Sequence, residues 1–152
     1  MNRICCFAGH SNCYFDESQK QHLKYLIEKL INENNLKEFW VGNYGGFDSI
    51  SARIVCDLKN KYSDIKLCLV IPYLTKKITD YRELYTKFDE IIMADIPQNT
   101  PRRFYIVKCN EYMINKSDYL IAFVNHGWGG AALTYKYAKK NKSIKVYNIG
   151  SY

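Results

Sequence analysis

The chain has 152 residues, of which 47% are hydrophobic and 24% are charged, which is typical of one globular domain and unlike a disordered chain. No stretch approaches the roughly 18 consecutive apolar residues of a membrane-spanning helix, so we expect no membrane partner. The 22 basic and 15 acidic side chains give a net charge of +7, but lysines and acids are interspersed along the sequence. Such a distribution is typical of solvated helix surfaces, and we therefore expect no nucleic-acid partner.

The first predicted elements are a strand at residues 3–8, a helix that begins with a capping box of Asp16 and Gln19 and carries apolar residues from 23 to 31, a strand at 37–42 and a helix from 47 to 58. A strand at 66–71 follows, then a tyrosine-rich segment at 75–87 that is helical in part, a strand at 90–94 and a loop at 96–101. The last predicted elements are a helix at 102–116, a strand at 118–124, a helix at 130–141 and a strand at 144–149. Apolar strands that alternate with helices are typical of a parallel sheet covered on both faces. The predicted fold is a single α/β domain over residues 1–152, a three-layer α/β/α Rossmann-like fold with about six mostly parallel strands.

Three of the predicted strands end in glycine-containing turns: 9–11, 42–48 and 125–131. Right-handed crossovers place the carboxyl ends of parallel strands at one edge of a sheet, so we expect the three turns to converge there. Glycines let a ligand approach the backbone, and the helix that follows each turn points free N–H groups at anions. The pattern therefore predicts a phosphate-bearing, nucleotide-like ligand.

Individual residues in and near these turns have two interpretations each. Gly9 and Ser11 would cradle a phosphate with help from a ring N–H of His10, or would form an ordinary turn. Asp48 would cap a helix or accept a hydrogen bond from a ribose hydroxyl. Trp128 would stack on a base or cover an interface. The predicted ligand-binding set is Gly9, His10, Ser11, Gly42, Asn43, Gly45, Gly46, Asp48, Pro72, Arg102, Arg103, Asn125, Gly127, Gly129, Gly130 and Ala131, in which the two arginines would supply a cation.

The start of the chain and its cysteines predict the compartment. Residues 1–6 lack the long apolar segment of a signal peptide, and the six cysteines form no Cys-x-x-Cys pair. The three histidines show no metal-ligand spacing with the cysteines or with each other. We therefore expect a cytoplasmic protein with reduced thiols, no structural disulfide, no metal and no cofactor.

Three segments, taken in order, resemble the SLOG superfamily: Cys-Cys-Phe-Ala-Gly-His at residues 5–10, the glycine-rich turn at 42–48, and Ser-Asp-Tyr-Leu-Ile-Ala-Phe-Val at 117–124 followed by Gly129 and Gly130. This Rossmann-like group contains the Lonely Guy phosphoribohydrolases and the DprA proteins, and the chain is similar to its small YpsA-like branch. The resemblance implies binding of nucleotides or nucleotide-derived molecules at the carboxyl edge of the strands. In some members it implies the sensing of signalling nucleotides in antiviral defence.

The resemblance to the Lonely Guy enzymes breaks at their charged residues. Their Arg-Lys-x-x-Met motif places its arginine at Cys109, and their Pro-Gly-Gly-x-Gly-Thr-x-x-Glu motif places its glutamate at Thr134. N-glycosidic cleavage needs charge stabilisation and an oriented water, which a thiol and a hydroxyl supply poorly. Our leading hypothesis is a non-catalytic module that senses or sequesters a nucleotide-derived signalling molecule. The alternatives are a Lonely Guy-like nucleoside 5′-monophosphate phosphoribohydrolase with displaced catalytic groups, and a DprA-like DNA-associated module.

Aromatic side chains crowd the last two predicted helices and the strands beside them: Tyr112, Tyr119, Trp128, Tyr135 and Tyr137. Tyrosine and tryptophan are favoured at interfaces, where one end of the side chain is apolar and the other is wet. We expect a homodimer, or an assembly of dimers, formed by the helices at 102–116 and 130–141. The alternative is that these aromatics complete the core of a monomer.

Overall fold

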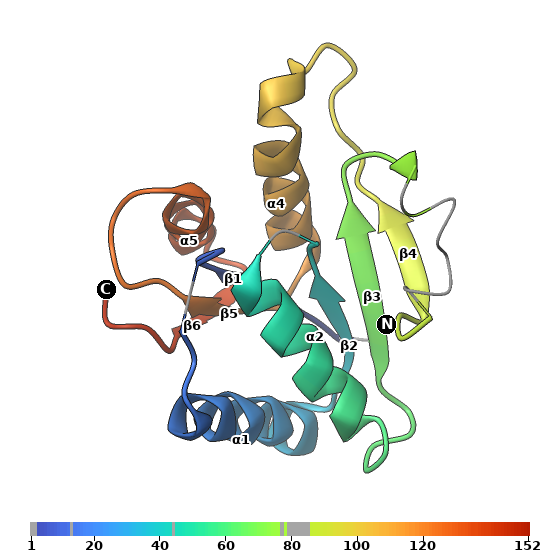
Figure 1. The fold of residues 1–152 in the computed structure, drawn as a ribbon, viewed down its shortest axis with the longest axis vertical. Coiled ribbons are helices and arrows are strands. Elements are labelled where there is room, and N and C mark those ends of the chain that lie inside the picture. Colours follow the sequence, from blue (N-terminus) through green and yellow to red (C-terminus); the bar gives the residue numbers. More distant parts are fainter. Residues whose placement is uncertain (1–2, 13, 44, 77, 79–85) are drawn as a thin grey trace.

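The computed structural model describes residues 3–12, 14–43, 45–76, 78 and 86–152. The described residues contain a six-stranded sheet in the order β4-β3-β2-β1-β5-β6 (Figure 1). Its strands are β1 (Arg3–Gly9), β2 (Leu36–Val41), β3 (Lys66–Ile71), β4 (Glu90–Met93), β5 (Tyr119–Phe123) and β6 (Lys145–Asn148). All five pairs of neighbouring strands are parallel, which confirms the predicted α/β class.

The helices form a layer on each face of this sheet. Helices α1 (Glu17–Asn34) and α2 (Gly46–Leu58) pack on one face, and α4 (Tyr105–Lys116) and α5 (Gly130–Lys140) pack on the other (Figure 1). A short 3₁₀ turn, η2 (Arg102–Phe104), leads into α4, so the helix predicted from residue 102 begins with a tighter turn. None of the helices among the described residues is long and apolar enough to cross a membrane.

The alternation of side chains along the central strand β1 explains the two separate cores. Cys5 and Phe7 belong to the core beneath α1 and α2, whereas Cys6 and Ala8 belong to the core beneath α4 and α5. Successive residues of a strand point to opposite faces, so a strand that is buried on both faces must be apolar throughout. The same alternation holds in β5, which is buried along its whole length.

The first helix begins where its sequence predicts. The side chain of Asp16 accepts the Gln19 backbone N–H at 2.8 Å, and the Gln19 side chain accepts the Asp16 N–H at 3.0 Å. This reciprocal capping box satisfies two N–H groups that the first turn of a helix leaves unpaired. Leu23, Ile27 and Leu30 then point into the core. The predicted tyrosine-rich segment at 75–87 falls mostly outside the described residues.

The topology determines where a ligand can enter. From β1 the chain builds β2, β3 and β4 on one side of the sheet, and then returns to place β5 and β6 on the other side. The strand order therefore reverses between β1 and β5. In open parallel sheets the crevice beyond the carboxyl ends of the strands at such a reversal is the usual ligand site.

Candidate functional site

A cavity of about 420 Å³ lies beyond the carboxyl ends of β1 and β5, at the reversal of strand order. It is bordered by the turn after β1, by the start of α2, by α4, and by the β5–α5 loop with the first turns of α5. The residues that line it are Phe7, Ala8, Gly9, His10, Ser11, Asn12, Asp48, Ile106, Asn110, His126, Trp128, Gly129, Gly130, Ala131 and Thr134. Its volume is within the range of small-molecule sites.

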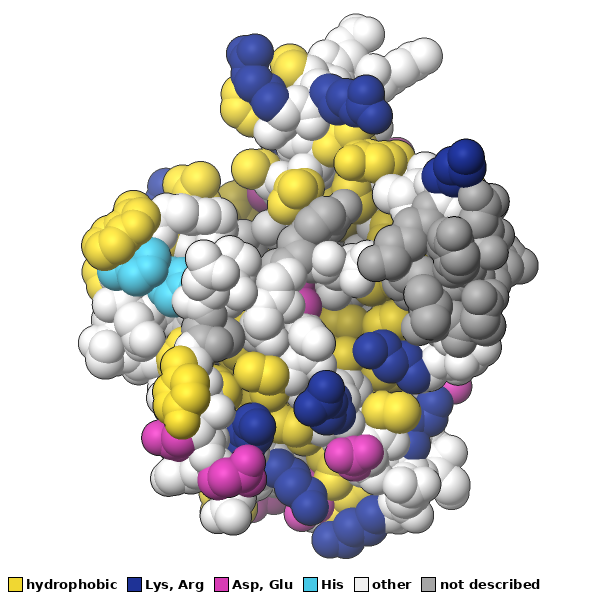
Figure 2. Space-filling model, viewed as in Figure 1, with side chains coloured by type: hydrophobic (Ala, Val, Ile, Leu, Met, Phe, Trp, Pro, Cys, Tyr) yellow, Lys and Arg dark blue, Asp and Glu magenta, His cyan; other side chains and the backbone are white. Residues whose placement is uncertain are grey.

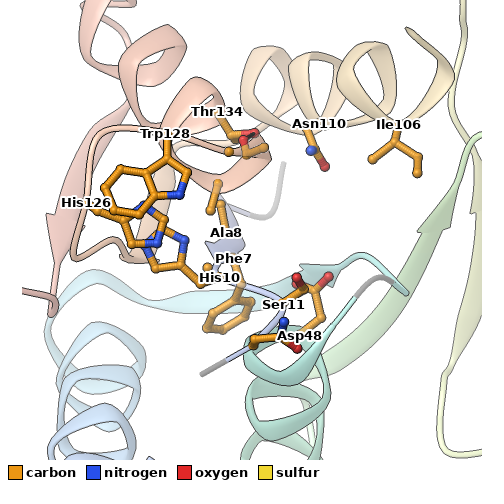
Figure 3. A pocket seen from close by; sticks show the side chains of 15 residues that line it. Phe7, Ala8, His10, Ser11, Asp48, Ile106, Asn110, His126, Trp128 and Thr134 are labelled. Atoms are coloured by element: carbon orange, nitrogen blue, oxygen red, sulfur yellow. Dashed lines mark hydrogen bonds between the residues drawn. The ribbon is translucent and has the colours of Figure 1, made fainter. Parts of the chain in front are cut away.

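Three stacked rings form one wall of the cavity. His126 lies between His10 and Trp128, with ring centroids 3.8 Å from His10 and 3.6 Å from Trp128 and interplanar angles of 12° and 22°. Figure 3 shows the three rings together on one side of the cavity, with Asn110 and Ile106 of α4 on the other side. The Trp128 residue is 71% exposed, so the stack offers an aromatic surface for another flat ring.

A hydrogen bond joins His10 to the loop that follows β5, which carries the other two rings of the stack. The backbone N–H of Asn125 donates to Nε2 of His10 at 3.0 Å, which requires this nitrogen to carry no proton. Burial, and secondarily the neighbouring His126, lowers the pKa of His10 below its usual value of 6.5. His10 is therefore neutral at neutral pH, and its ring acts as an acceptor toward the loop.

The amino end of α5 forms a second wall. Gly129 is the N-cap residue with φ of 93°, a conformation that favours glycine, and no side chain caps this helix. A Cβ atom on Gly129 or Gly130 would have nothing within 4 Å, so the helix start stands open to the cavity. The N–H groups at the start of a helix, together with the positive end of its dipole, favour an anion there.

The remaining polar lining is neutral or acidic. Asp48 from the first turn of α2 is joined by Ser11, Asn12 and Asn110. Within the part of the chain that the structure describes, no lysine or arginine lines the cavity. An anionic ligand would therefore be held by the amide end of α5, and the Asp48 carboxylate would serve as an acceptor for hydroxyl or amino groups.

The turn after β1 packs closely against the start of α2, with the Gly9 backbone against the Phe47 side chain and Gly45 against the Ser11 backbone. A Cβ on Gly9 would lie 2.3 Å from Phe47 Cγ, and a Cβ on Gly45 would lie 2.4 Å from the Cα of Ser11. The Gly46 N–H donates to the Ser11 carbonyl at 2.8 Å. In this arrangement the Gly46 amide bonds the neighbouring turn, so the predicted role of Gly46 as a phosphate-binding amide requires this bond to open.

The structure brings together part of the predicted ligand-binding set. Seven of its members line the cavity: Gly9, His10, Ser11, Asp48, Gly129, Gly130 and Ala131. Gly42, Asn43 and Gly45 instead line a hollow of about 70 Å³, to which Asp48 also belongs. Gly46, Pro72, Arg102, Arg103, Asn125 and Gly127 are absent from the lining of both.

The two arginines and two of the loop residues make other contacts. The Arg102 guanidinium lies over the Tyr73 ring at 5.8 Å from its centroid, and that of Arg103 over the Phe104 ring at 4.8 Å. Asn125 supports His10 through its backbone, and Gly127 leaves the space that Tyr152 occupies. These residues therefore act on the shape of the site or lie beyond it.

Sequence reasoning missed several lining residues. Ile106 and Asn110 lie one turn apart on α4, and neither of them was singled out from the sequence. Ile106 is 41% exposed, whereas Cys109 and Met113 are buried. His126 gave no metal-like spacing, and its role became visible only when the fold stacked it on His10. The pairing of a histidine in each of two glycine turns was the signal available.

The fold defines a small Rossmann-like domain with a cavity at the carboxyl edge of its parallel strands, and the comparison with family models assigns its family. The YpsA model, described as the YspA SLOG family, matches residues 12–151, and the chain belongs to this family. It is similar to YoqJ, an uncharacterised SPbeta prophage-derived protein of Bacillus subtilis strain 168, at 28% identity over 137 residues and 80% of each chain.

Two solved structures of DNA processing protein A share the fold. The Streptococcus pneumoniae protein superposes with a TM-score of 0.67 at 18% identity, over 97% of this chain and 50% of that one. The Helicobacter pylori protein, described as having a unique single-stranded DNA binding mode, gives 0.64 at 15% identity, over 96% of this chain and 64% of that one. The chain thus spans half to just under two thirds of these relatives. The family match confirms the SLOG resemblance, and these superpositions confirm the Rossmann-like fold.

The neutral state of His10 predicts a pH dependence of stability. Because the folded state lowers the pKa of His10, the unfolded chain takes up this proton first as the pH falls below about 6.5, and the free energy of unfolding decreases. His10→Gln should remove this dependence, whereas His22→Gln, on an exposed position of α1, should retain it. The measurement is the midpoint of thermal unfolding between about pH 7.5 and pH 5. Equal slopes for wild type and His10→Gln would contradict the assignment.

Proposed function

We propose that this protein binds a nucleotide or nucleotide-derived signalling molecule in the cavity without converting it, and thereby senses or sequesters it. The observation that carries the proposal is the combination in one cavity of an exposed aromatic stack and an open helix amino end. An aromatic ring system and a phosphate are the two ends of a nucleotide. Membership of the SLOG family supports this class of ligand.

Each part of such a ligand has a matching wall. The base would stack on Trp128, whose ring lies against His126 at one side of the cavity (Figure 3). The phosphate would lie at the first turn of α5, where glycines leave the backbone open. The carboxylate of Asp48 would accept a hydrogen bond from a ribose hydroxyl.

The residues at the Lonely Guy catalytic positions are unsuited to hydrolysis. Cys109 is buried, and burial, with a further contribution from Asp48, raises the pKa of its thiol to about 12. It is therefore neutral and cannot replace an arginine. The Thr134 hydroxyl donates to the Gly130 carbonyl at 2.9 Å, so its proton already has a partner within α5. Binding without cleavage is the function that these side chains favour.

Single-stranded DNA is the second candidate ligand. The description of the H. pylori relative as a single-stranded DNA binder, and the exposed Trp128, favour it. Nucleotide bases stack on exposed aromatic rings in such proteins. If a basic groove bound the DNA, the affinity for an oligothymidylate would fall steeply as the salt concentration rises. No described lysine or arginine lines this cavity, so we expect the affinity to depend little on salt. A steep salt dependence of tight oligothymidylate binding would favour the DNA function.

Filling the open start of α5 should block nucleotide binding while the fold persists. Gly130 has ordinary backbone angles and open space at its Cβ position, so Gly130→Val introduces bulk at the cavity wall without a clash. We expect at least about a tenfold loss of affinity, or ~1.4 kcal/mol, for adenosine 5′-monophosphate by calorimetry. Ser18→Val, in the exposed first turn of α1, is the matched control. Unchanged affinity in folded Gly130→Val would place the phosphate elsewhere.

Incubation with nucleoside 5′-monophosphates should release no free base. The neutral Cys109 and the internally bonded Thr134 offer no stabilisation for a developing oxocarbenium ion. Chromatography of the products after prolonged incubation, with heat-denatured protein as the blank, provides the measurement. Turnover that persists in the control Ser18→Val and is lost in both Gly130→Val and Asp48→Asn would instead establish the hydrolase alternative with a displaced acid.

Exposed apolar side chains support the proposal of a homodimer through α4 and α5. Ile106 and Leu133 are 41% and 57% exposed, and a groove of about 260 Å³ between the two helices is lined by Val107, Leu133 and Tyr137 among others. The tyrosines themselves support it less, because Tyr119 and Tyr135 are buried within the chain. Association would cover the apolar surface that the monomer leaves in water.

The dimer proposal predicts a mass near two chains by light scattering at micromolar concentration. Leu133→Asp should reduce this mass to one chain, because a carboxylate buried in an apolar interface is costly. Tyr25→Asp, which alters a somewhat more exposed side chain on α1, should leave the mass unchanged. A wild-type mass of one chain would contradict the proposal.

A further inference from the structure

Residues 148–152 lie against the loop that carries His126 and Trp128, although none of them lines the cavity. This 148–152 segment follows β6, and Figure 1 shows its end beside the loop between β5 and α5. The chain there runs close to the backbone of the loop. A Cβ on Gly150 would lie 2.4 Å from the Val124 carbonyl oxygen.

The side chain of Asn148 uses both ends of its amide to join the segment to the loop. Its Oδ1 accepts the N–H groups of Val124 and Gly150, each at 3.0 Å. Its Nδ2 donates to the carbonyl oxygens of Val124 at 3.1 Å and Tyr152 at 3.3 Å. An amide satisfies two acceptors and two donors at once, which neither a carboxylate nor an aliphatic side chain can do.

Further contacts extend from this amide to the loop itself. Oδ1 of Asn125 accepts the Ser151 N–H at 2.9 Å, and the Tyr152 N–H donates to the Val124 carbonyl at 3.0 Å. The Tyr152 ring takes the space beside Gly127, where a Cβ would meet its hydroxyl oxygen at 2.6 Å. The loop is thus held by His10 through the Asn125 N–H on one side and by residues 148–152 on the other.

We propose that the 148–152 segment sets the position of the Trp128 wall, with Asn148 as the positioning residue, so that affinity for an aromatic base depends on side chains that never touch it. The part that concerns affinity rests on the proposed nucleotide function. Apart from the stacking of His126 on His10, the loop has little packing, because Asn125 and Trp128 are exposed. Hydrogen bonds to neighbouring segments must therefore limit its motion, and local opening of such a loop costs less than global unfolding.

Asn148→Asp tests the proposal with a change of nearly identical shape. The carboxylate retains the two accepting contacts but turns a charged oxygen toward the carbonyls of Val124 and Tyr152. We expect amide hydrogen exchange of residues 124–128 to accelerate about tenfold in the free protein, with the sheet strands unchanged. Asn115→Asp is the matched control, because there only an accepting oxygen is used, toward the Tyr137 hydroxyl.

Affinity for adenosine 5′-monophosphate provides the second readout. Asn148→Asp should weaken it about tenfold, whereas Asn115→Asp should leave it unchanged. If wild type binds no mononucleotide, the proposed function fails, and exchange in the free protein still decides whether the segment positions the loop. Exchange at 124–128 equal to that of Asn115→Asp would overturn the proposal.

A second variant covers the case in which Asn148→Asp does not fold. Tyr152→Ala removes the ring beside Gly127 and leaves every contact of the Asn148 side chain in place. Tyr152 is 54% exposed, so the fold should persist. Faster exchange at residues 125–128 with an unchanged unfolding midpoint supports the proposal, and unchanged exchange in this folded variant refutes it.

Discussion

The contact between Gly9 and Phe47 is the constraint on which the site depends. Phe47, in the first turn of α2, is completely buried and occupies the space that any side chain on Gly9 would need. It packs with Phe7, Phe15 and Phe123 beneath the carboxyl edge of the sheet. Because a close-packed core yields little, this contact fixes the distance between the end of β1 and the start of α2. Asp48, the next residue of α2, is thereby placed at the cavity.

The two sides of the cavity are held by different forces. The side formed by Gly9 and Asp48 stands on the buried aromatic core, whereas the ring stack stands on an exposed loop that hydrogen bonds restrain. Such an arrangement gives a rigid floor and a wall whose position depends on several weak contacts. Individual hydrogen bonds contribute only about 1 kcal/mol each, so the wall responds to small changes that leave the fold intact.

The charge of the molecule and the charge of its cavity differ in sign. The chain carries +7, yet the described lining holds the Asp48 carboxylate and neutral groups. On the face that Figure 2 shows, lysine and arginine side chains are spread from end to end, and acidic side chains lie among them mainly in the lower part of the view. Surface charge attracts an anion over roughly the 8 Å Debye length of physiological salt, whereas contact inside the cavity must come from amide groups. The overall positive charge would therefore attract an anionic ligand to the molecule, whereas the amide groups of the cavity would bind it.

Local patterns in the sequence determined the elements and the class of fold. The capping box of Asp16 and Gln19, the helical spacing of Leu23, Ile27 and Leu30, and the apolar strands are all short-range signals, and the structure confirms them. The convergence of the turns after β1 and β5 also followed, because parallel strands with right-handed crossovers must end at one edge. The SLOG resemblance was likewise legible in the order of these turns.

Only the tertiary structure decided which side chains meet. His10 and His126 are far apart in the sequence, each in its own glycine-containing turn, and their rings stack because β1 and β5 are neighbours. Arg102 and Arg103 looked like phosphate ligands but lie over aromatic rings away from the cavity. No sequence pattern pointed to Asn148, because its proposed positioning role depends on hydrogen bonds to four backbone groups that come together only when β6 pairs with β5. Periodicity and turn chemistry act over a few residues, whereas a binding wall is made by contacts between distant ones.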